Sequence, residues 1–431
     1  MQYYSTKNKY LNVALREAVL QGLPQDNGLY MPRLIPKLQP DFFQKLAQMS
    51  FPEMAYHIAK AFFEEDLPDK TIREIVEGAI TFDAPLVELE KNLYCLELFH
   101  GPTLAFKDFA ARFMARLMGD LIKDSEQKLT ILVATSGDTG SAVAHGFYNV
   151  PGIDVVVLYP CGKVSSLQEK QMTTLGGNVS ALEVAGSFDD CQAMVKQAFL
   201  DNDLRKIRPL SSANSINIAR LIPQTFYYFR AIAQLQDSSL PTIVSVPSGN
   251  FGNLTAGVLA TKMGLPIDGF IAATNANDVV PRYLDSGKFQ PKPSISTFSN
   301  AMDVGNPSNF ARMQDIFQKD HAKTIELLQG RAFSDEETLV GQQLLDKRYN
   351  YIADPHGAIG YLGLQEILLE GQECNRIFLG TAHPAKFPDV VHRALNREPD
   401  IPDRLQVVLN KEGHAEKISA DYQQLRGKLL D

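Results

Sequence analysis

The feature that most constrains the fold of this chain is a repeated alternation of short apolar runs with stretches of helical period. Leu129–Ala134 is a continuous apolar run, and Ile153–Tyr159 and Val179–Val184 follow it. Helical patterns at Ser165–Leu175 and Phe188–Leu200 come between and after these runs. Apolar runs of this length are typical of strands buried on both faces of a parallel sheet. The alternation predicts βαβ units, and therefore a parallel sheet covered by helices.

The same alternation begins again at Thr242, where TIVSV predicts a strand and Leu254–Met263 a helix. Phe270–Thr274 and Arg376–Leu379 are further predicted strands, and Phe289–Phe310 reads as a long ordered loop. Two α/β units in tandem favour a site in the cleft between them.

A chain of 431 residues is too long for one hydrophobic core and predicts several domains. The first residues are mainly of helical pattern, with Gly22 as a stop signal after Asn12. We therefore expect two tandem three-layer α/β units with a mainly helical N-terminal domain. The expected domains are a helical domain at 1–95, a first α/β domain at 96–235, a second at 236–395, and a C-terminal tail at 396–431.

Charge and composition argue against several classes of protein. A net charge of -8 does not favour nucleic-acid binding, which needs a basic face. No run approaches the roughly 20 apolar residues that cross a bilayer, and the N-terminus lacks the pattern of a secretory signal. The four cysteines are far apart, so no CxxC pair or metal spacing is present. We expect a cytoplasmic protein that binds no metal, nucleic acid or membrane.

Lys107 is the residue most suggestive of chemistry. It lies in HGPTLAFKDF, from His100 to Phe109, in the first turn of a predicted helix. A helix N-terminus favours anions, and Leu104–Phe106 before the lysine are apolar. An amine so placed can have a lowered pKa and act as a nucleophile. By position alone it could equally be a surface lysine at the start of a helix.

Two further loops each follow a predicted strand and open a helix. SGNFGN, from Ser248 to Asn253, offers glycines and free N–H groups that suit a phosphate. TSGDTG, from Thr135 to Gly140, offers hydroxyls that suit a carboxylate, although Asp138 would repel an anion unless it points away or caps the helix. Either loop could instead be an ordinary tight turn or helix cap.

At these residues the chain resembles the threonine synthases, members of the second structural class of pyridoxal-phosphate enzymes. The segments that carry the resemblance occur in the family's order: GLPQDNGLYMP at 22–32, LELFHGPTLAFKDF around Lys107, ATSGDTGSAVAH at 134–145, SANSINIAR at 212–220, VPSGNFGN at 246–253 and LGTAHPAKF at 379–387. They span most of the chain.

The resemblance implies a role for each site residue. Lys107 would hold pyridoxal 5'-phosphate as a Schiff base and transfer the Cα proton. Ser248, Gly249, Asn250, Phe251 and Gly252 would cradle the cofactor phosphate, and Thr381 would face the pyridine nitrogen. Thr135, Ser136, Asp138 and Thr139 would hold the substrate carboxylate. The substrate phosphate needs donors of its own, and the cluster of polar residues in SANSINIAR makes Asn214, Asn217 and Arg220 our candidates for it, with Lys163 and Lys386 as weaker ones.

The implied reaction converts O-phospho-L-homoserine and water to L-threonine and phosphate. Two alternatives share Lys107 and the phosphate loop. One is a pyridoxal-phosphate β-eliminase, which would release a keto acid and ammonia instead of threonine. The other is a cofactor-binding relative without activity, against which the intact Lys107 and Thr381 argue. For Arg220, a solvated charge on a helix is the plain alternative to a role in binding.

Overall fold

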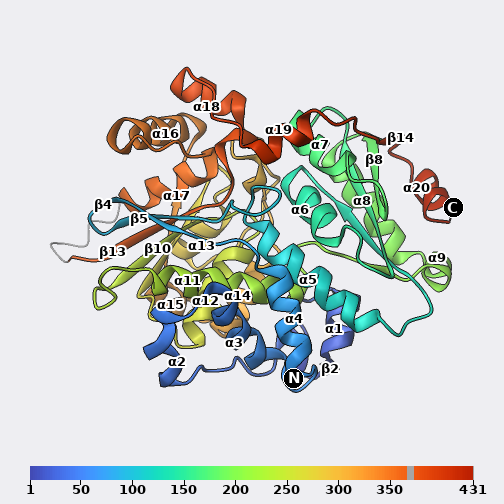
Figure 1. The fold of residues 1–431 in the computed structure, drawn as a ribbon, viewed down its shortest axis with the longest axis horizontal. Coiled ribbons are helices and arrows are strands. Elements are labelled where there is room, and N and C mark those ends of the chain that lie inside the picture. The colour runs from blue at the N-terminus through green and yellow to red at the C-terminus, as the bar shows by residue number, and fades with distance from the viewer. Residues whose placement is uncertain (366–372, 431) are drawn as a thin grey trace.

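The computed structural model describes residues 1–365 and 373–430, in which two predominantly parallel sheets organise the chain (Figure 1). The first has the order β14-β8-β7-β6-β9 with every neighbouring pair parallel. Its strands are β6 (Leu129–Ala134), β7 (Ile153–Pro160), β8 (Val179–Ala185), β9 (Leu210–Ser211) and β14 (Glu416–Ser419). The three runs that open the sequence pattern are strands β6 to β8, and the predicted α/β class is confirmed.

The second sheet has the order β12-β11-β10-β13-β5-β4. Its strands are β4 (Leu86–Glu90), β5 (Leu93–Glu97), β10 (Thr242–Pro247), β11 (Gly269–Thr274), β12 (Leu328–Ala332) and β13 (Asn375–Gly380). All pairs are parallel except β4 with β5. The expected boundary between residues 95 and 96 therefore falls inside β5, and this hairpin belongs to the edge of the second sheet.

Helices cover both sheets. Those of the first unit are α5 (Lys107–Ile122), α6 (Asp138–Phe147), α7 (Ser166–Thr173), α8 (Phe188–Leu200) and α9 (Asn202–Ile207). The chain then crosses through α10 (Ile218–Leu221), the 3-10 turn η2 (Ile222–Thr225) and α11 (Phe226–Ala233). The second unit has α12 (Gly252–Lys262), α13 (Val279–Ser286), α14 (Phe310–Ile316), α15 (His321–Leu327), α16 (Asp335–Tyr349) and α17 (Pro355–Gln365). None of the described helices is long and apolar enough to span a bilayer.

The N-terminal region combines helices with a small sheet. Its helices are α1 (Leu15–Gln21), α2 (Pro40–Lys45), α3 (Phe51–Phe63) and α4 (Asp69–Ala79). Gly22 ends α1 with a φ of 70°, a conformation that glycine adopts without steric cost. Strands β1 (Gln2–Ser5), β2 (Val13–Ala14) and β3 (Tyr30–Pro32) form an antiparallel sheet that the sequence did not predict.

After β13 the chain forms the 3-10 turn η4 (Pro384–Lys386), α18 (Pro388–Leu395), α19 (Asp403–Leu409), β14 and α20 (Tyr422–Leu430). Figure 1 shows this tail, in red, returning from the second unit to the first. There β14 pairs with β8, and α20 packs against α8. The predicted tail is thus an integral part of the first sheet.

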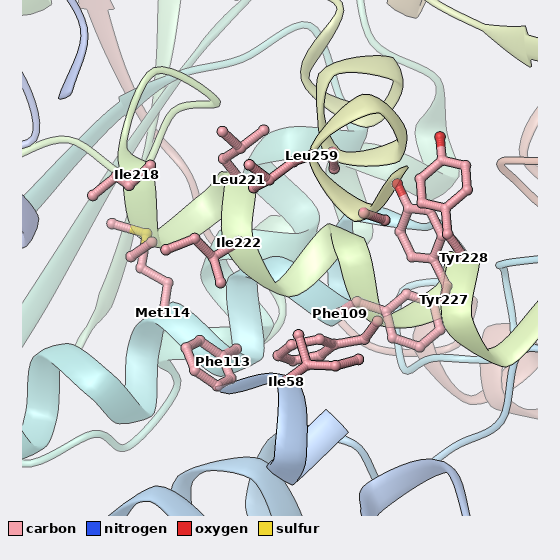
Figure 2. Close-up of a cluster of buried hydrophobic side chains, with 14 of the residues drawn as sticks. Ile58, Phe109, Phe113, Met114, Ile218, Leu221, Ile222, Tyr227, Tyr228 and Leu259 are labelled. Carbon is pink, nitrogen blue, oxygen red and sulfur yellow. The ribbon is translucent and has the colours of Figure 1, made fainter. Parts of the chain in front are cut away.

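A buried apolar cluster joins the N-terminal helices to the crossing segment (Figure 2). Ile58 of α3 lies in this cluster with Phe109 and Phe113 of α5. Ile218 and Leu221 of α10 and Leu259 of α12 belong to the same cluster. It therefore fixes the three helices that carry Lys107, Arg220 and the loop at Ser248.

Candidate active site

Lys107 is the first residue of α5, and its position depends on a contact between two distant segments. Phe106 donates its N–H to the carbonyl of Thr381 at 2.9 Å, and His383 donates to the carbonyl of Leu104 at 3.0 Å. An antiparallel bridge between Ala105 and Ala382 lies between these bonds. The lysine is consequently held next to the segment that contains Thr381.

The amine of Lys107 is in a poor environment for a positive charge. Its pKa is lowered to about 8, chiefly by burial; the carboxylate of Asp138 raises the pKa, and the cations Arg220 and Lys386 lower it. At pH 7 an amine with this pKa is neutral in about one molecule in ten, several hundred times more often than an ordinary lysine, and that fraction can act as a nucleophile or base. The alternative of an ordinary surface lysine is therefore wrong.

The loop Ser248–Phe251 leads from β10 into α12 and presents backbone donors. Phe251 caps the helix in the left-handed region, with φ at 60°. Ser248 donates its own N–H to Ala273 at 2.9 Å and its hydroxyl to Asn253 at 2.9 Å, so both are already used within the protein. The first N–H groups of a helix lack partners within it, which leaves the N–H groups of Gly252 and Asn253 suited to an anion.

Neighbouring segments hold this loop in place. Asn250 donates to the hydroxyl of Ser215 at 2.5 Å and accepts the N–H of Ser308 at 2.5 Å. A Cβ on Gly249 would lie 2.6 Å from the Cα of Met302, so this position admits only glycine without rearrangement. The loop is therefore rigid before any ligand binds, as an anion site requires.

The loop Thr135–Thr139 contains two kinds of hydroxyl. Thr135 is buried, and its oxygen accepts the N–H groups of Gly137 at 3.0 Å and Gly140 at 2.8 Å, so it shapes the loop. Ser136 and Thr139 are partly exposed, and their side chains make no hydrogen bond to another described residue. Of the predicted hydroxyls, these two are the ones that remain available to a substrate.

Asp138, which was predicted to help hold the substrate carboxylate, has its side chain bound to two buried partners within the protein. Its carboxylate is 2.6 Å from the ammonium group of Lys386 and accepts a hydrogen bond from Gln168 at 2.9 Å. Burial disfavours its charge, but Lys386, Lys107 and these hydrogen bonds together hold its pKa well below the usual range. Asp138 does not cap α6, for which the structure records no side-chain cap at Gly137.

The polar side chains of the segment Ser212–Arg220 are of two kinds: some are hydrogen-bonded within the protein, and others are free to bind a ligand. The amide of Asn217 is buried, donates to the carbonyl of Val19 at 2.8 Å, and accepts the N–H of Ala219 at 3.0 Å. This side chain is fully used in joining α1 to α10, and so its predicted contact with substrate phosphate is disfavoured. Asn214 is half-buried and its side chain makes no hydrogen bond to a described residue.

Arg220 is 3% exposed, so the alternative of a solvated helix charge is wrong. One terminal nitrogen donates to the carbonyl of Ala213 at 2.6 Å, while the buried Nε has no partner among the described residues. Gln224 donates to the carbonyl of Arg220 at 2.6 Å and lies 3.6 Å from where a Cβ on Gly252 would be. The backbone of Arg220 therefore lies near the start of α12, and the charge of its guanidinium group acts on Lys107.

Two buried residues of the site have contacts that the sequence did not predict. Lys386, a weaker candidate for the substrate phosphate, binds Asp138, and Gln168 binds the same carboxylate. Lys386 is completely buried, whereas Lys163 is exposed. Gln168 lies in the first turn of α7, outside the three loops that carry the predicted site. The capping box of α7, in which Gln168 bonds to Ser165, was the signal that could have placed its side chain.

Family models match almost the whole chain. Residues 80–376 match a model described as pyridoxal-phosphate dependent enzyme. Residues 2–80 match the threonine synthase N terminus, and residues 357–427 match the threonine synthase C-terminal model. The boundary at residue 80 agrees with the end of α4 and leaves the β4–β5 hairpin with the enzyme core.

Individual relatives match over their full length. The chain is 46% identical to the threonine synthase of Haemophilus influenzae, with 100% of both chains covered. The crystal structure of threonine synthase from Escherichia coli superposes with a TM-score of 0.92 at 43% identity, covering 100% of this chain and 99% of that one. A PLP-bound threonine synthase structure from Brucella melitensis gives a TM-score of 0.93 at 33% identity, covering 100% and 98%.

Proposed function

The chain belongs to the threonine synthase family, and from this membership we propose how the residues of its site carry out the family's reaction. The enzyme uses pyridoxal phosphate to convert O-phospho-L-homoserine and water to L-threonine and phosphate. The assignment of individual residues is the proposal.

The residues present fit the cofactor. Lys107 has an amine whose pKa is lowered to about 8, which suits covalent attachment to an aldehyde. The helix N-terminus at Gly252, with Phe251 in the left-handed region, suits the cofactor phosphate. Thr381 is buried beside Phe106, and its hydroxyl makes no hydrogen bond to a described residue. In the proposal that hydroxyl faces the ring nitrogen.

Pyridoxal phosphate, when bound, supplies an electron sink that stabilises negative charge at the substrate α-carbon. Lys107 anchors the cofactor, and its amine accepts the Cα proton once the substrate amine has displaced it. Ser136 and Thr139 orient the substrate carboxylate with their free hydroxyls. For the atoms to balance, a proton would leave Cβ as phosphate leaves Cγ, Cγ would gain a proton to become the methyl group, and water would add its hydroxyl at Cβ. The amine of Lys107 would return a proton to Cα.

Arg220 is proposed to bind the phosphate of the substrate, with Asn214 as a second contact. The observation that carries this assignment is the buried Nε of Arg220, which has no partner among the described residues. A buried guanidinium donor without an acceptor costs free energy, and a phosphate oxygen would satisfy it with a charge-assisted hydrogen bond. The neutral Asn214 side chain adds a donor without adding charge.

Steady-state kinetics of Arg220→Ala tests the assignment. We expect kcat/KM for O-phospho-L-homoserine to fall by roughly 100-fold, because a buried charge-assisted contact is lost. The cofactor absorbance should remain, because Arg220 does not hold the cofactor. Arg205→Ala removes an exposed arginine from α9 and is the matched control. An unchanged kcat/KM in Arg220→Ala would refute the assignment.

Product analysis of the wild-type enzyme separates the reaction from that of a β-eliminase. Threonine and phosphate should be released in equal amounts, and a keto acid with ammonia would indicate the eliminase instead.

The proposal also places the enzyme in the cytoplasm, which is supported by four cysteines that are all free.

A further inference from the structure

Lys386 is the buried cation nearest to the site whose purpose the reaction does not explain. It lies in η4, at the end of the segment that begins with Thr381, and its side chain is completely buried. Its ammonium group makes two contacts, with the carboxylate of Asp138 at 2.6 Å and the carbonyl of Thr103 at 2.8 Å. Burying a lysine is costly unless such partners compensate for lost hydration.

These contacts connect three parts of the site. Thr103 precedes the helix that begins at Lys107, and Asp138 begins the helix after the carboxylate loop. The segment of Lys386 is already bonded to Leu104 and Phe106 through the main chain. The ammonium group of Lys386 therefore connects the segment before Lys107, the loop Thr135–Thr139 and the segment that begins with Thr381.

Asp138 is the only member of its loop that would repel a carboxylate. Lys386 and Gln168 both bind its carboxylate, and a Cβ on Gly137 would lie 2.4 Å from the Oε1 of Gln168. The side chain of Gln168 thus packs closely against Gly137 while it donates to Asp138. This arrangement directs the negative charge of Asp138 towards Lys386, and leaves Ser136 and Thr139 to face an anion.

The charges that act on Lys107 are those of Asp138, Arg220 and Lys386. Lys386 also acts on Asp108 and on His145, which face it from α5 and α6. Asp138 and Lys386 form a pair of opposite charges beside an amine that must change its protonation state. Removing one charge of the pair leaves the other uncompensated at that amine.

We propose that Lys386 is a positioning residue of this site, which through its pair with Asp138 sets the charge balance at Lys107 and turns Asp138 away from the substrate carboxylate. This inference rests on the proposed roles of Lys107 and of the loop Thr135–Thr139. In this proposal Lys386 contacts neither the substrate nor the cofactor.

The two charges of the pair predict opposite effects when removed. In Lys386→Met the free carboxylate of Asp138 favours the protonated form of the Lys107 nitrogen. In Asp138→Asn the free ammonium group of Lys386 disfavours it. The double variant Lys386→Met with Asp138→Asn has neither charge, and so it should return towards the wild type. A purely structural role predicts no such reversal of sign.

The test is a pH titration of the absorbance of the bound cofactor in each holoenzyme, followed by kcat and KM over the same pH range. The apparent pKa should rise by about one unit or more in Lys386→Met and fall by a similar amount in Asp138→Asn. The acid limb of kcat should move in the same directions. The apparent pKa of the double variant should lie between those of the two single variants, and its KM should be nearer to the wild-type value than theirs.

Lys206→Met removes a lysine from the exposed pair with Asp203 and is the control. If one single variant fails to fold, comparing the double variant with the other single variant still gives the direction in which the apparent pKa shifts. Shifts in the same direction, or no shift in either, would overturn the proposal. A wild-type holoenzyme without a cofactor band, or without phosphate release, would instead contradict the proposed function.

Discussion

At the scale of single residues, the chemistry of this site depends on ionisable groups that are buried together. Lys107, Arg220 and Lys386 are cations of one region, and Asp108 and Asp138 are its anions. Burial opposes every one of these charges, so each depends on its neighbours. The two carboxyls respond differently: the pKa of Asp138 is lowered by its cations, whereas burial raises the pKa of Asp108 to about 6.

Asp108 should therefore make the stability of the protein depend on pH. Burial raises its folded pKa to about 6, against hydrogen bonds from Thr103 and the charge of Lys386 that lower it. A carboxyl in an unfolded chain has a pKa of about 3.9. Because the folded state holds the proton more tightly, the stability that protonated Asp108 contributes is complete below about pH 4 and is lost as pH rises through about 6.

Asp108→Asn cannot ionise, so its stability relative to wild type should increase as pH rises from about 4 to about 7. The expected gain is up to about 3 kcal/mol in the free energy of unfolding. Urea denaturation of both holoenzymes at several pH values measures it. Asp203→Asn, on the exposed face of α9, should show no such trend. If the wild type and Asp108→Asn have parallel pH profiles, the buried carboxyl is not the cause.

The sequence singled out candidate site residues but did not predict what their side chains contact within the protein. Lys107 stands out because a cation is poorly placed at a helix N-terminus, and the loop at Ser248 because its glycines and free N–H groups suit an anion. The pairing of Asp138 with Lys386 joins residues that are far apart in the chain, and no local pattern contains it. The same holds for Asn217, whose amide bonds to Val19 instead of facing a ligand.

At the scale of elements, both anion loops of this chain connect a buried parallel strand to a helix, and glycine makes each connection possible. Gly137 has φ at 137° and ψ at -89°, a conformation essentially restricted to glycine. The apolar runs predicted β6 and β10 well, because strands buried on both faces need no other signal. The short strands β12 and β14 were missed, since their sequences carry polar residues at the edges of the sheets.

Gly137→Ala should distort the carboxylate loop. The added Cβ would lie 2.4 Å from the Oε1 of Gln168, in a backbone conformation that alanine disfavours. We expect a loss of about 2 kcal/mol in unfolding free energy and a larger KM, because Gln168 can no longer bond to Asp138 as it does. Gly427→Ala, in α20, is a matched control, since nothing lies within 4 Å of its Cβ. Equal KM values for the two variants would contradict this explanation.

At the scale of the whole molecule, each α/β unit is completed by a segment that lies next to the other unit in sequence. The β4–β5 hairpin precedes the first unit in sequence but completes the second sheet. The C-terminal tail follows the second unit but adds β14 to the first sheet (Figure 1). Sequence reasoning gave these segments to an N-terminal domain and to a tail. Only long-range pairing decides their place, and short amphipathic segments carry little information about a distant partner.

The tail should therefore stabilise the first unit without taking part in the chemistry. Leu425 of α20 is fully buried, in a cluster that includes Val184 of β8 and Met194 of α8. Leu425→Ala leaves a cavity there and should cost about 2–4 kcal/mol of unfolding free energy. The kcat of the folded enzyme should be unchanged, because this cluster contains none of the site residues. Thermal and urea denaturation, with kcat at 25 °C, measure both effects.

Gln423→Ala is the matched control, because this side chain of the same helix is exposed. Its unfolding free energy should differ from the wild type by less than about 0.5 kcal/mol. If the first unit and its tail unfold together, Leu425→Ala should show one unfolding transition with a lowered midpoint. A tail that unfolds separately would instead give an earlier transition during which activity is kept. A loss of kcat in Leu425→Ala at a temperature where it is fully folded would show instead that the tail reaches the site. The structural link would then be α19, where Arg404 donates to the carbonyls of His100 and Gly101 just ahead of the Lys107 helix.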